Sequence, residues 1–188
     1  MWENQFNLFD SHDASRLHNN PKISRAGFRG AVIFQFLLTG AASVYYGDEA
    51  EIDGTLGAME GCRYPMPWDR DITACDAYRV IHTMAHLKAD HKALSRGGMK
   101  FLYAEGSVVA IARFWENEVF VGVISTESQD VRIRLPLGAV GACEPKGNAD
   151  IFDTPLEYRP MADASIELTV KAGQSYLMEC CQAPSAQC

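Results

Sequence analysis

The residues best suited to chemistry lie near the start of the chain, where His12, Asp13 and Arg16 follow an apolar stretch at residues 6–9. A carboxylate beside an imidazole, with a guanidinium close by, suits the binding of a polyhydroxylated molecule and the stabilisation of positive charge in a transition state. A His-Asp pair also occurs in solvated loops and at helix ends. Whether these residues form a binding site or a solvated loop therefore depends on the strands and helices around them.

The apolar stretch at residues 6–9 predicts a short parallel strand that is covered on both faces, with the ionisable residues in the loop at its carboxyl end. A helix beginning at Asn20 and Pro21 is expected next. Residues 43–46 predict a second strand, followed by an acidic loop at Asp48. Since a strand, helix, strand unit forms a right-handed crossover, both loops should emerge at the same end of the sheet, where α/β folds bind ligands.

Residues 47–72 are rich in glycine and proline and predict a long loop. The loop contains Arg63 and Trp68, and such side chains can bind sugar hydroxyls and cover the apolar face of a sugar ring. The alternative is that Trp68 only packs the loop onto the body of the protein. Both interpretations stay open at the level of the sequence.

A second helix is predicted from Thr73, whose spacing to Asp76 resembles a capping box. His82, His86 and Asp90 follow at intervals of four residues, which is the spacing of metal ligands on a helix. They lie on the flank opposite much of the apolar stripe, so a solvated helix face is the preferred interpretation. We therefore expect no metal site, and the sequence indicates no cofactor.

From residue 97 onward the apolar residues alternate with polar ones, and turn signals separate the alternating stretches. Strands are predicted at residues 99–104, 108–115, 119–126, 131–135, 151–152, 156–159, 166–170 and 175–181. This pattern is typical of an antiparallel β-sandwich. Two domains are expected, an α/β unit at residues 1–96 and an all-β unit at 97–182, with a tail at 183–188.

Composition excludes several classes of protein. With 47% hydrophobic and 22% charged residues, the chain has ordinary globular composition, and its net charge of -7 argues against a nucleic-acid partner. No apolar run reaches the length of a membrane span, and the N-terminus lacks the features of a signal peptide, so a cytoplasmic protein is expected. The six cysteines lack zinc-type spacing and are expected to be reduced structural thiols.

Two motifs, Phe-Asn-Leu-Phe-Asp-Ser-His-Asp-x-x-Arg at residues 6–16 and Val-Tyr-Tyr-Gly-Asp-Glu at 44–49, resemble the α-amylase family, glycoside hydrolase family 13, in spacing and order. The stretch Cys-Arg-Tyr-Pro-Met-Pro-Trp-Asp at 62–69 is similar to one in neopullulanases, cyclomaltodextrinases and maltogenic amylases. Residues 91–97, His-Lys-Ala-Leu-Ser-Arg-Gly, are similar to the pattern His-x-Ala-Leu-x-x-Gly near which the last barrel helix of that family ends. The sequence departs from the family at Ala14-Ser15, where Thr-Pro is usual, and at Glu60-Gly61.

The resemblance implies the last two βα units of a TIM (β/α)8 barrel, followed by an antiparallel β-sandwich domain. It implies that Asp13 is the carboxylate that stabilises the transition state. It implies that His12, beside Asp13, hydrogen-bonds sugar hydroxyls. The other candidate substrate-binding residues are Arg16, Asp48, Arg63 and Trp68. A retaining glycosidase also needs a nucleophile and an acid about 5 Å apart, and no residue here matches the family's motifs for these two groups.

The chain is therefore expected to be the C-terminal part of a retaining glycosidase that hydrolyses an α-glucan or maltooligosaccharide, and to be inactive alone. Two alternatives stay open: a non-catalytic carbohydrate-binding or assembly module, and a structural domain that associates with itself. Two parallel strands alone leave edges and an apolar face uncovered. A homo-oligomer, or association through the truncated barrel, is expected for that reason.

Overall fold

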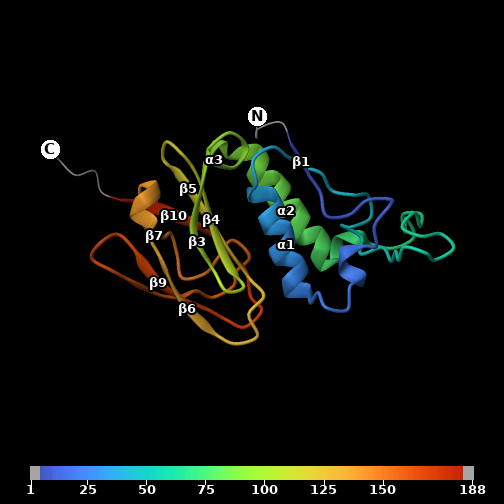
Figure 1. Ribbon diagram of the computed structural model, residues 1–188. Coiled ribbons are helices and arrows are strands. Elements are labelled where there is room, and N and C mark those ends of the chain that lie inside the picture. Colours follow the sequence, from blue (N-terminus) through green and yellow to red (C-terminus); the bar gives the residue numbers. More distant parts are fainter. Residues whose placement is uncertain (1–4, 184–188) are drawn as a thin grey trace.

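The computed structural model describes residues 5–183, in which a helical unit lies beside a β-sheet unit (Figure 1). The helical unit contains the strands β1 (Phe6–Asn7) and β2 (Ala41–Ala42), the 3-10 helices η2 (Leu17–Asn19) and η3 (Ile72–Ala74), and the helices α1 (Arg25–Leu37), α2 (Asp76–Asp90) and α3 (Lys92–Ser95). Residues 184–188 of the expected tail at 183–188 lie outside the described residues, as do the N-terminal residues 1–4. No helix of the described part is long and apolar enough to cross a membrane.

The two strands β1 and β2 pair in parallel, as the crossover argument predicted, with Phe6 opposite Ala41. Strand β1 is shorter than predicted. The predicted strand at residues 43–46 is wrong, because the second strand lies just before it, at Ala41–Ala42. The prediction of a strand covered on both faces is wrong, because Phe6 and Leu8 are 77% and 52% exposed. The reason is that β2 is the only strand beside β1 in the described residues, so most of the apolar surface of the stretch meets no packed layer.

Helix α1 is attached to the two strands through Gln35, a buried polar residue on the helix. The side-chain amide of Gln35 donates to the carbonyl oxygens of Asn7 and Ser43, at 2.6 and 2.8 Å. One side chain thus satisfies a backbone acceptor on each of the two segments that the helix connects. These two hydrogen bonds hold α1 in a fixed position relative to the loops that follow the strands.

Both predicted helix starts are wrong by a few residues. Helix α1 is capped by Ser24, whose hydroxyl accepts from the Gly27 amide, whereas Asn20 forms a local turn before the helix. Helix α2 begins at Asp76, after η3, and its N-cap residue Cys75 makes no side-chain capping bond, so the predicted capping box is wrong. The carboxylate of Asp71 caps η3 by accepting from the Thr73 amide. Several residues that can cap a helix precede each helix, so the sequence alone does not fix the residue at which the helix begins.

The second unit consists of two antiparallel sheets, with strand orders β3-β4-β5-β10-β7 and β6-β9-β8. Their bounds are β3 (Gly98–Glu105), β4 (Val108–Trp115), β5 (Glu118–Ser125), β6 (Val131–Leu135), β7 (Ala142–Pro145), β8 (Glu157–Pro160), β9 (Ile166–Val170) and β10 (Tyr176–Gln182). Side chains from the facing surfaces of both sheets share one core, as in a sandwich. The predicted strand at 151–152 is wrong, since these residues form a turn, and β7 was missed because its proline-ended sequence shows no clear alternation.

The other face of the five-stranded sheet is covered by the helices (Figure 1). Phe28, Ile33 and Met84 from the helices form a second core with Phe120 from the sheet. Helix and sheet approach so closely that a Cβ at Gly122 would lie 2.1 Å from a methyl carbon of Leu37. The helical unit and the sandwich therefore share a packed interface, and the position of one fixes the position of the other.

Candidate functional site

The loop after β1 and the long loop after β2 bring three predicted site residues together. The imidazole Nε2 of His12 lies 3.0 Å from Oδ2 of Asp13, and Nη2 of Arg63 lies 3.6 Å from the other carboxylate oxygen. The side chains of all three residues are more than half exposed. We call His12, Asp13 and Arg63 the rim group. A carboxylate oriented in this way can accept hydrogen bonds from hydroxyl groups and face developing positive charge.

Arg16 and Asp48 form a buried ion pair that ties these loops together. Nη1 of Arg16 lies 2.6 Å from Oδ1 of Asp48, and Nη2 donates to the Cys62 carbonyl at 3.3 Å. The guanidinium also lies over the ring of Tyr45, 4.2 Å from its centre. Arg16 has no exposed surface and Asp48 is only 7% exposed, so in this structure both residues support the loops rather than face solvent.

A second carboxylate, Asp10, lies close to this pair and was not recognised in the sequence. Both of its oxygens accept from the backbone amide of Leu17, at 3.0 and 2.8 Å. Burial, together with the negative charge of Asp10, raises the pKa of Asp48 to about 7, although Arg16 opposes this rise. The position of Asp10 directly after the apolar stretch was the signal available in the sequence.

The raised pKa of Asp48 makes the stability of the fold depend on pH. The folded chain binds more protons than the unfolded chain between pH 3.8 and about 7, so the free energy of unfolding contributed by Asp48 falls as the pH rises through this window. Asp48→Asn imitates the protonated carboxyl group and is expected to remove this dependence. Relative to wild type, the variant should gain on the order of 2 kcal/mol between pH 5 and pH 8.

Urea unfolding of both proteins at pH 5 and pH 8 measures this difference. The exposed Asp90→Asn provides the matched control, since it removes a carboxylate that is already in water. If Asp48→Asn keeps the pH slope of the wild type, Asp48 is not the group that titrates.

The side chain of Trp68, in the long loop after β2, lies in solvent. Trp68 is 80% exposed, so the interpretation in which it packs the loop onto the body is wrong. The hydroxyl of Tyr46 donates to the carbonyl of Tyr64 at 2.8 Å and fixes the loop to the segment after β2. The indole is thus held on an anchored loop with its ring free for a ligand.

The histidines of α2 lie on a solvated face, as predicted. His82 and His86 are exposed, and their ring centres lie 4.3 Å apart. In the part of the chain that the structure describes, no group of three or more histidine, cysteine or acidic side chains could hold a metal ion. The free cysteines of that part are Cys62, Cys75, Cys143, Cys180 and Cys181.

No protein-family model matches the chain. A cyclomaltodextrinase of Bacillus sp is 39% identical over 116 residues, which cover 62% of this chain and 20% of that protein. Neopullulanase 2 of Thermoactinomyces vulgaris is 31% identical over 137 residues, which cover 70% of this chain and 23% of that protein.

A solved structure of a cyclomaltodextrinase superposes with a TM-score of 0.75 at 27% identity, over 95% of this chain and 30% of that one. The match extends across both the helical unit and the sheets. This chain thus spans between a fifth and a third of the length of the proteins it matches.

Proposed function

We propose that this chain, which is similar to the cyclomaltodextrinases and neopullulanases of the α-amylase family, is the C-terminal part of a retaining glycosidase that hydrolyses α-glucans. Residues 1–96 are then the last two βα units of a (β/α)8 barrel, and residues 97–182 its C-terminal β-sandwich. The observation that carries this proposal is the rim group at the carboxyl ends of two parallel strands. Barrel enzymes place their catalytic groups at that end.

In this mechanism the carboxylate of Asp13 stabilises the oxocarbenium-like transition state, and His12 hydrogen-bonds the sugar hydroxyls. Arg63 orients Asp13, and Trp68 covers the apolar face of a sugar ring. The buried pair of Arg16 and Asp48 holds the loops that present these groups. The nucleophile and the acid, about 5 Å apart in a retaining enzyme, would come from other strands of the barrel.

The isolated chain is expected to show no glycosidase activity, because Asp13 stabilises charge but neither attacks the sugar nor protonates the leaving group. The measurement is release of reducing sugar from maltooligosaccharides and of nitrophenol from a nitrophenyl glucoside. A rate that survives repurification and disappears in Asp13→Ala would overturn this assignment of roles.

A non-catalytic carbohydrate-binding or assembly module is the second candidate, and the exposed Trp68 favours it. The two candidates differ in the full-length protein. If the chain belongs to a non-catalytic module, the full-length protein should bind maltooligosaccharide saturably without hydrolysing it, and Trp68→Ala should weaken this binding. If the chain belongs to a glycosidase, the full-length protein should hydrolyse maltooligosaccharide, and this hydrolysis should depend on Asp13.

The exposed apolar residues of the stretch around β1 predict self-association of the isolated chain. Phe6, Leu8 and Phe9 are 77%, 52% and 38% exposed, and burying them against a second copy would remove apolar surface from water. Sedimentation at tens of micromolar should detect a dimer or larger species, which Phe6→Asp with Leu8→Asp weakens. Phe101→Asp, at a 53% exposed position on the sandwich, is the control. A strict monomer in which residues 6–9 resist hydrogen exchange would contradict this prediction.

A further inference from the structure

The turn that presents His12 and Asp13 belongs to a loop, residues 10–17, whose two ends are joined by one carboxylate. Both oxygens of Asp10 accept from the backbone amide of Leu17, at 3.0 and 2.8 Å. Asp10 is only 5% exposed, so water competes little for these oxygens. A hydrogen bond to an ionised acceptor is stronger than one between neutral groups, and closing a loop at its base removes conformational freedom from the residues between.

The Leu17 end of this closure is itself fixed. Leu17 begins the 3-10 helix η2, and its side chain packs against the core that the helices share with the sheet. At the other end of η2, the side-chain amide of Asn19 donates to Asp53 at 2.7 Å, and its oxygen accepts from the Gly54 amide at 2.7 Å. Asp10 therefore ties the loop to a part of the chain that several other contacts already hold.

The long loop after β2 supports the second half of the loop at 10–17. The amide of Arg16 donates to the Gly54 carbonyl at 2.8 Å. The Leu56 amide donates to the hydroxyl of Ser15 at 2.9 Å. These two hydrogen bonds hold the segment directly after the turn, so the turn is bounded on one side by Asp10 and on the other by the long loop.

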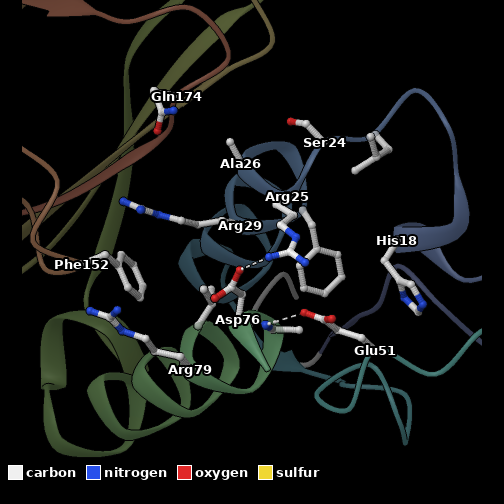
Figure 2. A pocket seen from close by; sticks show the side chains of 14 residues that line it. His18, Ser24, Arg25, Ala26, Arg29, Glu51, Asp76, Arg79, Phe152 and Gln174 are labelled. Carbon is white, nitrogen blue, oxygen red and sulfur yellow. Dashed lines mark hydrogen bonds and ion pairs between the residues drawn. The ribbon is translucent and has the colours of Figure 1, made fainter. Parts of the chain in front are cut away.

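This supporting segment is anchored to α2. Oε1 of Glu51 accepts from the amide of Ala77, in the first turn of α2, at 3.3 Å, and both residues line a cavity at the start of that helix (Figure 2). The Arg70 guanidinium donates to the Ala50 carbonyl and braces the same segment from the far end of the long loop. The support beneath the turn is therefore held by contacts that do not involve the turn itself.

The turn that carries Asp13 is held weakly by its own contacts. The Ala14 amide donates to the Ser11 carbonyl at 3.3 Å, which is longer than the usual distance of about 2.9 Å. The Asp13 amide donates to the Ser11 hydroxyl at 3.1 Å. The ion pair with Arg63 spans 3.6 Å between exposed side chains, and pairs of this kind stabilise little. The position of Asp13 therefore depends on how the base of the loop is held.

We propose that Asp10 is a positioning residue for the rim group: its carboxylate closes the loop at 10–17 and so determines where Asp13 stands relative to the substrate. Asp10 acts through the Leu17 amide and is too deeply buried to touch the substrate itself. That the position of Asp13 affects turnover rests on the proposed function. The closure of the loop rests on the contacts of Asp10 alone.

The first part of the test uses this chain, labelled with ¹⁵N and followed by NMR. Asp10→Ala removes the acceptor, so the Leu17 amide should exchange with solvent at least about tenfold faster, and the order parameters of residues 11–14 should fall. Asp10→Ser, which is too short to reach Leu17, gives the same expected result if Asp10→Ala does not fold. Asp10→Asn keeps one oxygen for that amide and removes a charge beside Asp48, so it should behave like the unmodified chain. Asp90→Ala removes an exposed carboxylate from α2 and is the matched control.

The second part measures kcat and KM for a cyclomaltodextrin in the full-length enzyme that carries this chain. Asp10→Ala should lower kcat by about 10- to 100-fold, because a displacement of about 1 Å at a catalytic group has a cost of this order, while KM changes by less than about threefold. Asp10→Asn should keep kcat within about threefold of the unmodified enzyme. Leu168→Ala opens a cavity in the sandwich core and lowers stability away from the loop, so it should keep kcat.

Unchanged exchange of the Leu17 amide and unchanged order at residues 11–14 in Asp10→Ala would overturn the proposal, as would a loosened loop with full kcat in an active enzyme. A loss of kcat in Asp10→Asn as large as in Asp10→Ala would assign the effect to charge, and an equal loss in Leu168→Ala would assign it to stability; either result also overturns it. If the unmodified full-length protein hydrolyses no cyclomaltodextrin, the proposed function fails, and the exchange of the Leu17 amide still decides whether Asp10 closes the loop.

Discussion

Replacement of Asp13 by Asn in a full-length enzyme that carries this chain is expected to lower turnover by about 10²- to 10³-fold, the cost of removing one preorganised electrostatic contact in an active site. The Asn side chain keeps the shape of the carboxylate and loses its charge. The contact strengthens as positive charge develops, so KM should change much less than kcat. Steady-state hydrolysis of a cyclomaltodextrin measures both constants.

Asp90→Asn is the matched control for this variant, because it makes the same exchange on the exposed end of α2. It should retain the turnover of the unmodified enzyme. If Asp13→Asn kept more than about a tenth of that turnover, Asp13 would have no catalytic role.

Arg16→Met is expected to produce the largest loss of stability in the chain, about 3 to 5 kcal/mol at pH 8. At that pH the Asp48 carboxyl of the unmodified chain is ionised, and the variant must either keep this charge buried without the guanidinium 2.6 Å away or bind a proton, each at a cost in stability. The Cys62 carbonyl also loses its donor, and Tyr45 loses the cation over its ring. The loops that present the rim group should then become mobile, which denaturant unfolding and hydrogen exchange of residues 47–72 would detect.

The double variant Arg16→Met with Asp48→Asn isolates the charge effect, because it removes the unpaired carboxylate as well. It should recover much of the lost stability, and the cost of Arg16→Met alone should be smaller at pH 5, where Asp48 is protonated. Equal losses at both pH values, with no recovery in the double variant, would show that Arg16 acts through packing alone.

The parts of the site that follow from chain direction could be predicted from the sequence. A strand, helix, strand unit requires parallel strands, which places the loops of Asp13 and Asp48 at one end of the sheet. The motif at 62–69 likewise indicated that Arg63 belongs with them, and the structure places it beside Asp13.

The parts that depend on tertiary contact could not be predicted. Gly122 looks like an ordinary strand glycine in the sequence, yet it permits the close approach of Leu37 that joins the two units. Residues 43–46 have high β-propensity, but Tyr45 packs against Arg16 instead of forming a ladder.

The most direct test of the central claim is a chimera in which this chain replaces the matching segment of the Bacillus cyclomaltodextrinase, assayed for hydrolysis of a cyclomaltodextrin. The account predicts that the chimera is active, that the remainder of that enzyme without the segment is inactive, and that Asp13→Asn in the chimera removes the activity. A folded chimera that does not hydrolyse cyclomaltodextrin, or one whose activity is indifferent to Asp13→Asn, would contradict the claim that this chain supplies the catalytic rim of an α-glucan hydrolase.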